Sequence, residues 1–226
     1  TRRDLSQKAI TFYVDSLFRP TWINAIRQSA DEWNKVFKDV GLNAYIDIKP
    51  FTKDSMFHVD DPLTNTIRLA NGNKTSINEY NVTDPRTGEI LSSKINIGRD
   101  FATTVRRKGV CQMADVDERF RTYDMPDDLV CEALKSYMLK AFGLTLGLDA
   151  NYAGSYAYTP QQLRSPEFTK KYGITASVMD DVLYNYIARP GDKEKGVALV
   201  VDKPGVYDEF AIRYLYDSIG DNSKKA

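Results

Sequence analysis

Two long amphipathic segments constrain the fold more than any other feature of the sequence. The first covers about residues 20–40 and ends before Gly41; the second covers about residues 127–144, and Gly143 or Gly147 should stop it. Each begins at a proline, and two aspartates follow the second proline, as is typical of helix N-termini. Apolar residues recur in both segments at three- and four-residue spacing, which predicts helices with one buried face.

Short β-prone segments fill most of the remaining first half of the chain. The hairpin turn should lie at Asp84–Gly88, because its proline presets a turn and its glycine permits a positive φ. Since strands come mainly first and helices follow, the fold class predicted is α+β. The strands are expected over Ala9–Asp15, Tyr45–Ile48 and Asn65–Ala70, with the hairpin over Ile77–Ile97.

The second half predicts loops and shorter helices. Residues 151–165 are rich in loop-forming residues, and helices are expected near Ala176–Ile187 and Asp208–Asp217. The breaker Arg189–Asp192 separates these two helices. The polar stretch Arg99–Tyr123 has some helical character.

Histidine content limits the chemistry of this chain. There is one histidine, His58, among 226 residues. Histidine is the commonest zinc ligand and a frequent general base, so a three-histidine zinc site is impossible. Cys111 and Cys131 lack a metal-binding spacing; we expect two free thiols, with a disulfide as the alternative.

Charge and hydropathy argue against two classes of partner. Lysine plus arginine and aspartate plus glutamate each number 31, and Arg106–Lys108 is the one basic block. Nucleic-acid binders usually carry a basic face, so we expect no nucleic-acid partner. No apolar run approaches the roughly 18 residues that a membrane-spanning helix needs, so we expect no membrane span.

The segment Lys140–Asn151 carries a resemblance to a known family, the metzincin zinc peptidases, through its frame G-L-T-L-G-L-x-x-N. That family has H-E-x-x-H-x-x-G-x-x-H here: two histidines one helical turn apart grip zinc, the glutamate polarises water, and the glycine lets a third histidine reach the ion. The turn glycine is retained as Gly147. The chemical positions are replaced: Lys140 and Leu144 stand at the first two histidines, Ala141 at the glutamate, and Ala150 at the third histidine.

Flanking motifs extend this resemblance from about residue 10 to about residue 216. Together they are similar to exported bacterial zinc-dependent metalloproteases of the metzincin type. Residues 176–180 resemble the methionine turn, with Met179 as its methionine. The other matching segments are residues 83–90, 163–169 and 205–212.

The resemblance implies a metzincin-like (zincin) fold. Its features are a twisted mixed sheet, mostly parallel with an antiparallel edge strand over the cleft, two long helices and a methionine turn. We expect a single domain over residues 1–226, with an N-terminal subdomain at 1–150 and a C-terminal subdomain at 151–226. The family also implies export to the periplasm, cell surface or medium; the sequence begins without a signal peptide, which a mature domain would have lost.

The replaced positions predict that zinc chemistry has been lost. Leu144 and Ala150 offer no donor atom, Lys140 repels a divalent cation, and Ala141 cannot act as a base. We therefore expect no zinc or other cofactor and no catalytic residue. Lys140 either points to water or pairs in the vacated cavity with Asp180 or Asp149.

Apolar side chains should fill the rest of the former site, namely Phe142, Leu144 and Met179. The loop with Tyr152, Tyr156 and Tyr158 lies beside it, and is either a surface for peptide or glycan or a packed cover. Other candidates are weaker: no site is expected at His58, and Asp54, Asp60 and Asp61 lack EF-hand spacing.

Three functions from different classes are compatible with the sequence. The leading one is a catalytically inactive metallopeptidase homologue that acts as a binding or interaction module, for a peptide or protein in the cleft or for neighbouring domains. The second is an active metallopeptidase or other hydrolase with non-histidine ligands, which needs clustered carboxylates such as Glu132, Asp149 and Asp180. The third is a structural scaffold domain of a larger exported protein.

Overall fold

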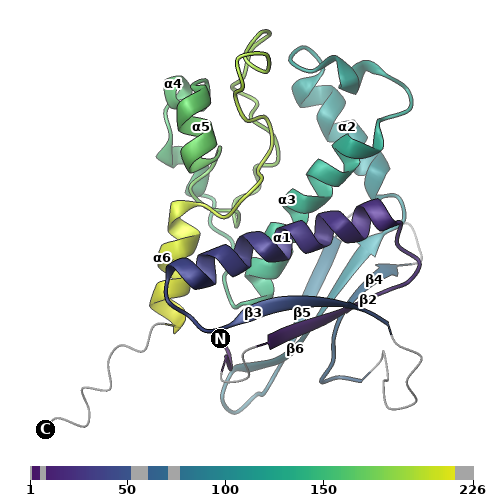
Figure 1. Ribbon diagram of the computed structural model, residues 1–226, viewed down its shortest axis with the longest axis vertical. Coiled ribbons are helices and arrows are strands. Elements are labelled where there is room, and N and C mark those ends of the chain that lie inside the picture. Colours follow the sequence, from purple (N-terminus) through teal and green to yellow (C-terminus); the bar gives the residue numbers. More distant parts are fainter. Residues whose placement is uncertain (1, 6–8, 52–60, 71–76, 217–226) are drawn as a thin grey trace, which may run out of the picture.

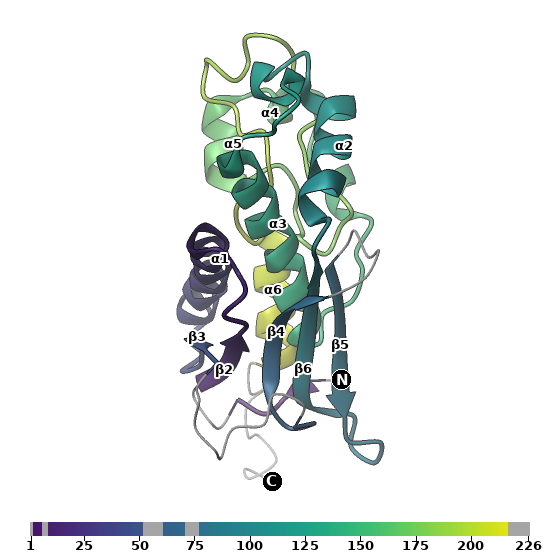
Figure 2. The same ribbon diagram turned by 90° about the vertical axis from the view of Figure 1, so that its right-hand side faces the viewer.

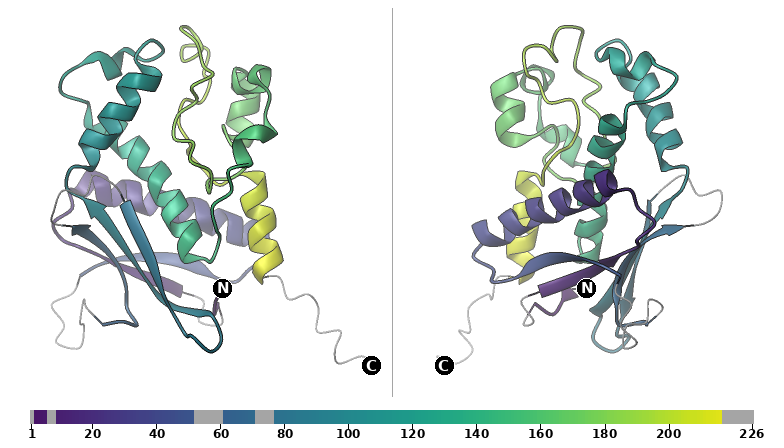
Figure 3. Two further views of the ribbon diagram at one scale, coloured as in Figure 1. Left: turned by 180° about the vertical axis from the view of Figure 1, so that it is seen from behind. Right: turned by 45° about the vertical axis from the view of Figure 1, so that its right-hand side comes forward.

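The computed structural model describes residues 2–5, 9–51, 61–70 and 77–216. His58, Asp54 and Asp60 lie outside these ranges, so the interpretations of these three residues stay predictions. The described residues form one twisted sheet with the two long helices against one of its faces, and several shorter helices lie beyond one end of the sheet (Figures 1, 2 and 3). The predicted α+β class is confirmed.

The sheet is mostly parallel, with one antiparallel strand. Its order is β1-β6-β4-β2-β3, and β5 pairs with the other side of β6. β5 is antiparallel to β6, and every other pairing is parallel. The strands are β1 (Arg2–Arg3), β2 (Ala9–Val14), β3 (Tyr45–Pro50), β4 (Asn65–Ala70), β5 (Ile77–Thr83) and β6 (Glu89–Gly98).

Both long helices form as expected, as α1 (Pro20–Asp39) and α3 (Asp127–Thr145). They pack against each other, and the Trp33 indole of α1 donates a hydrogen bond of 2.9 Å to the Leu139 carbonyl of α3. The shorter helices are α2 (Phe101–Met113), α4 (Pro160–Leu163), α5 (Pro166–Tyr172) and α6 (Val206–Tyr216), with 3-10 turns η1 (Glu118–Arg121) and η2 (Gly154–Ala157). No helix in the described part of the chain is long and apolar enough to cross a membrane.

The helix predicted near Ala176–Ile187 is wrong. This segment consists of turns and one antiparallel bridge, between Tyr184 and Val200. The reason is burial: all residues from Gly173 to Asp180 are buried, so the segment has no solvent face and helical spacing carries no information there. Its backbone amides do not form the i to i−4 hydrogen bonds of a helix; the amide of Asn185, for example, donates to the Leu199 carbonyl.

The stretch expected to be loop, residues 151–165, contains η2 and α4. Helix α4 starts with a capping box, in which the Thr159 hydroxyl accepts from the Gln162 amide and the Gln162 side chain accepts from the Thr159 amide. The sequence T-P-Q-Q contains this signal, a threonine followed three residues later by glutamine with proline at the first helical position.

Two buried aspartates anchor the long segment between residues 181 and 205, which lies between α2 and α4–α5 in Figure 1. Lys193 donates to Asp117 at 2.8 Å, and Arg164 donates to Asp192 at 2.7 Å. Although burial raises the pKa of Asp117, hydrogen bonds from Arg119 and Lys193 lower it to about 2. The hydrogen bond from Arg164 lowers the pKa of Asp192 to about 2.

Candidate functional site at the end of helix α3

The four positions predicted to be replaced, Lys140, Ala141, Leu144 and Ala150, lie on the last turns of α3 and on the loop that follows it. Ala141 is buried, Leu144 is half-buried and Ala150 is exposed. Phe142, expected to fill the former site, instead packs edge-on against Phe12 of β2, with ring centroids 5.3 Å apart. The helix therefore presents Lys140 and Leu144 outward and keeps its aromatic side chain in the core.

Gly147 ends α3 in a Schellman motif. Its φ is 88°, its amide donates to the Leu144 carbonyl at 3.0 Å, and the Leu148 amide donates to the Gly143 carbonyl at 3.1 Å. These are the two hydrogen bonds of the motif, and the positive φ favours glycine. The retained turn glycine thus has a local structural cause in this chain.

Replacement of Gly147 by alanine is expected to lower the free energy of unfolding by about 1 kcal/mol, because a Cβ disfavours the positive φ. Urea denaturation followed by circular dichroism measures it. Gly147→Asn is the matched control and should lose less, since asparagine tolerates this region better. An alanine variant as stable as the wild type would show that the turn adopts another conformation.

Lys140 forms an ion pair, but with a carboxylate other than the two expected. Its ammonium donates to Asp181 Oδ1 at 3.0 Å and to the Asp180 carbonyl at 3.3 Å, and its side chain is 25% exposed. The Asp180 carboxylate instead accepts from the amides of Ser155 and Asp181, both at 2.6 Å. Asp149 accepts from the Ala150 amide. Lys140 thus neither points freely to water nor lies deep in a vacated cavity.

The charge of Lys140 acts on two carboxyl groups from different parts of the fold. Its hydrogen bond lowers the pKa of Asp181, which follows the predicted methionine turn of residues 176–180. Burial raises the pKa of Glu79 on β5, and the positive charge of Lys140 opposes this rise. The cavity beside Lys140 measures only about 20 Å³, which is room for about one water molecule.

Residues 176–180, the predicted methionine turn and called the methionine-turn segment below, pack directly against α3 through Met179. Met179 is buried, and a Cβ built on Gly143 would lie 2.5 Å from its sulfur. The Met179 carbonyl accepts from the Asn151 amide at 3.1 Å, which connects this segment to the loop that carries Ala150. The structure therefore brings together the retained frame residues Gly147 and Met179 around the replaced positions.

Asp208 in the first turn of α6 holds the methionine-turn segment in place. Its carboxylate accepts from Ser177 Oγ at 2.6 Å and from the amides of Val178 at 2.8 Å and Gly205 at 2.7 Å. Burial raises the pKa of Asp208, and these three hydrogen bonds oppose the rise. A Cβ on Gly205 would lie 2.2 Å from the Ala176 carbonyl oxygen, so glycine permits this close approach.

The C-terminal carbonyls of α3 are capped by side chains from distant parts of the chain. Arg3 Nε donates to the Thr145 carbonyl at 3.3 Å, Asn81 to the Leu144 carbonyl at 2.9 Å, and the Tyr216 hydroxyl to the Leu146 carbonyl at 2.6 Å. The Arg3 guanidinium also donates to Asn65 Oδ1 and Ser93 Oγ. Burial lowers the pKa of Arg3 to about 10, so it stays protonated at neutral pH.

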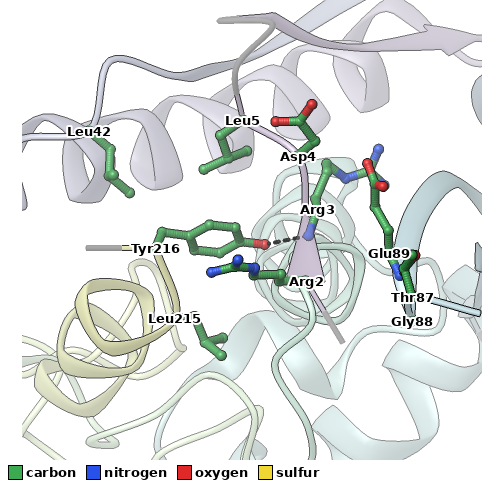
Figure 4. A pocket seen from close by; sticks show the side chains of 10 residues that line it. All are labelled: Arg2, Arg3, Asp4, Leu5, Leu42, Thr87, Gly88, Glu89, Leu215 and Tyr216. Atoms are coloured by element: carbon green, nitrogen blue, oxygen red, sulfur yellow. Dashed lines mark hydrogen bonds between the residues drawn. The ribbon is translucent and has the colours of Figure 1, made fainter. Parts of the chain in front are cut away.

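Sequence reasoning missed Arg3 and Tyr216. The sequence offers one signal for them. The last turn of α3 has no basic residue, so a cation that stabilises the negative C-terminal end of the helix dipole must come from another part of the chain. Figure 4 shows the two side chains together, with the Arg3 amide bonded to the Tyr216 hydroxyl at the wall of a cavity of about 640 Å³. Leu5, Leu42 and Leu215 form its apolar side.

A groove of about 280 Å³ lies beside the loop of residues 147–151 and Met179, with α6 as its other wall. Tyr207, Phe210 and Tyr214 form an exposed aromatic ridge on α6, at 47%, 60% and 68% exposure. Their spacing of three and four residues puts them on one helix face, and neighbouring ring centroids lie 6.0 and 6.2 Å apart. Exposed apolar patches of this kind often mark interaction sites.

The tyrosine loop divides into exposed and packed members. Tyr152 and Tyr156 are exposed, whereas Tyr158 packs edge-on against Phe168 of α5 at 4.9 Å. Burial raises the pKa of Tyr158. None of these contacts tests whether the loop binds a ligand, so the predicted surface at these tyrosines stays a prediction.

The residues at the four motif positions do not fit a zinc ion. Zinc needs neutral or anionic donors in a tetrahedral arrangement, and these positions supply an ammonium group and three hydrocarbon side chains. Nor do Glu132, Asp149 and Asp180 form a substitute: no group of three or more His, Cys, Asp or Glu side chains within the described ranges could hold a metal. Glu132 faces Arg119 at 3.7 Å, and burial raises its pKa.

Comparison with known proteins supports the family on the C-terminal part of the chain. Residues 122–226 match the sequence profile of a family described as Met-zincin. The matched range contains α3, the methionine-turn segment and α6. No curated protein sequence matches the chain. Residues 122–226 are therefore similar to that family, and the α+β fold of the described residues is compatible with it.

Proposed function

We propose that this chain is a catalytically inactive metallopeptidase homologue that serves as a binding or interaction module. The observation that carries the proposal is the chemistry of α3: an ion-paired lysine and a buried alanine occupy the positions of the first zinc ligand and the general base. A divalent ion there would meet a fixed positive charge at close range. Export is part of the same proposal and rests on the family resemblance alone.

The groove beside the aromatic ridge Tyr207, Phe210 and Tyr214 is the proposed binding surface. It borders the motif loop at Ala150, and so lies next to the former catalytic position. Aromatic side chains provide large contact area at low conformational cost, which suits recognition of a peptide or protein. The alternative of a scaffold domain predicts no partner at this groove; the alternative of an active hydrolase lacks the carboxylate cluster that it requires among the described residues.

Restoring the histidines tests the placement of the degenerate site. The variant Lys140→His/Leu144→His/Ala150→His should bind about one zinc per chain, because three histidines in this frame supply a sufficient ligand set. The wild type, dialysed against zinc and then desalted, should retain none by elemental analysis. Ala141→Glu is left out of this variant because Ala141 is buried, and a carboxylate there would cost stability.

The matched control is Leu144→His/Ala150→His, which keeps Lys140 and should bind zinc at least about tenfold more weakly. Circular dichroism checks that each variant is folded. Stoichiometric zinc in the wild type would refute the inactive assignment. A folded triple variant that takes up no zinc would show that the motif has been placed at the wrong residues.

A further inference from the structure

A cavity of about 330 Å³ lies beyond the carboxyl ends of the parallel strands β2, β4 and β6. Its lining includes Leu17, which follows β2, Leu69 near the end of β4, and Arg99, which follows β6. Ligands of sheets with parallel strands commonly bind beyond the carboxyl ends of those strands. None of the motif residues of α3 lines this cavity.

The cavity has apolar walls. Phe18, Trp22 and Val130 are buried, with at most 7% of their surface exposed, and Met125 and Leu69 are half-buried beside them. A volume of this size with aromatic and aliphatic walls suits the apolar body of a small molecule.

The polar groups at the cavity favour an anion. Arg99 forms no ion pair or hydrogen bond with any described residue. Arg19 pairs with Asp127 at 3.4 Å, but their side chains are 73% and 41% exposed, so water screens this pair and it is weak. Among the described residues that line the cavity, two arginines and one aspartate give a net positive charge.

The helices α1, α2 and α3 all begin at this cavity, and none has a side-chain cap at its N-terminus. Helices α1 and α2 also lack an acidic residue in the first turn, whereas α4 and α5 are capped by Thr159 and Ser165. Uncapped first turns leave amide donors free and carry partial positive charge. Three helix N-termini without a side-chain cap thus meet at the cavity.

A second, independent observation is an unsatisfied donor in the cavity wall. The Nε1 of Trp22 is buried and has no hydrogen-bond acceptor among the described residues. Buried indole N–H groups normally find an acceptor, and a donor left without one is costly. An occupant with an oxygen acceptor would remove that cost.

We infer that this cavity binds a small monocarboxylate with an apolar body. The apolar body would lie against Phe18 and Val130. The carboxylate would lie toward Arg99 and the first turn of α2, where Phe101 packs edge-on against Trp22, so that an oxygen can accept from the Trp22 Nε1. The inference does not depend on the state of the α3 motif, so it stands or falls separately from the proposed function.

Octanoate is the test probe, and octanol, which has the same chain without the charge, is the comparator. Tryptophan fluorescence reports binding at Trp22, because the other tryptophan, Trp33, is fully buried and bonded to Leu139. Octanoate should give a saturable change and bind about tenfold more tightly than octanol, which is the size expected of one charge-assisted contact. Trp22→Phe should abolish the fluorescence change, while calorimetry still detects octanoate.

Arg99→Gln should weaken octanoate binding about tenfold and leave octanol binding unchanged. Arg107→Gln is the matched control: this arginine lies on α2, is exposed and lines none of the cavities described above, so its loss should leave both affinities unchanged. Equal affinity for octanoate and octanol, no saturable binding, or equal effects of the two arginine variants would each overturn the inference.

Discussion

Asp208→Ala is expected to lower the free energy of unfolding by about 4 kcal/mol. The variant leaves three buried donors, Ser177 Oγ and the amides of Val178 and Gly205, without their acceptor. Each such donor costs about 1–3 kcal/mol when it cannot reach water. Because these donors belong to the methionine-turn segment and the start of α6, the loss should also loosen the floor beneath α3. Urea denaturation followed by circular dichroism measures the effect.

Asp208→Asn is the matched control and should cost no more than about 1.5 kcal/mol, since the amide can still accept from both backbone donors.

The stability contributed by Asp208 should also depend on pH. Burial raises the pKa of Asp208 above its ordinary value of 3.8, so the native state holds the carboxyl proton more tightly than the unfolded chain. The contribution of this group to stability is therefore full below pH 3.8 and falls as the pH rises through the native pKa. The asparagine variant lacks this dependence. An alanine variant as stable as the asparagine variant would contradict the role of Asp208.

Arg3→Met is expected to lower the free energy of unfolding by about 3 kcal/mol. It removes the donors for the Thr145 carbonyl, Asn65 Oδ1 and Ser93 Oγ, all of which lie at the end of α3 or in the sheet beside it. Hydrogen bonds to a charged group are worth about 1.5–3 kcal/mol, and the relief of burying a cation offsets part of their loss. Thermal or urea denaturation would show the change.

Arg2→Met supplies the comparison on the neighbouring position of β1. Arg2 is exposed and has no hydrogen bond or ion pair with the described residues, so its loss should change stability by less than about 0.5 kcal/mol. Equal effects of the two methionine variants would mean that Arg3 does not cap α3.

The strongly periodic elements could be predicted from the sequence, and their bounds agree closely. Helix α1 was expected over residues 20–40 and is found at Pro20–Asp39, and the stop at Gly143 or Gly147 agrees with a helix that ends at Thr145. Strands β2, β4 and β5–β6 were also found. These elements have one buried face, so burial and periodicity coincide.

The elements that failed prediction lack such a face or are too short. Strand β1 has two residues, and its pairing with β6 depends on the arrangement of the whole sheet. Residues 176–180, the first part of the segment 176–187, are all buried, so apolar spacing there gave a false helix. The division into subdomains at residue 150 stays a prediction.

At the candidate site, the replacement of the four motif positions stays a prediction that rests on the resemblance. For Lys140 the sequence left two alternatives, a side chain in water or an ion pair with Asp180 or Asp149, and the observed partner is Asp181. Asp180 does not pair with Lys140 because its carboxylate already accepts hydrogen bonds from the Ser155 and Asp181 amides, and no local sequence pattern predicts these two bonds. The aromatic ridge on α6 was likewise hidden, because its helix is apolar on more than one face.

The capping of α3 by Arg3 and Tyr216 has a consequence for the order in which the chain folds. These two residues hydrogen-bond to each other across 213 positions, and both complete the end of the same helix. Contacts of such separation require closure of a very long loop before they contribute, which slows folding. During synthesis, helix α3 therefore stays incompletely capped until residue 216 has left the ribosome, and early intermediates expose its unsatisfied carbonyls to other chains.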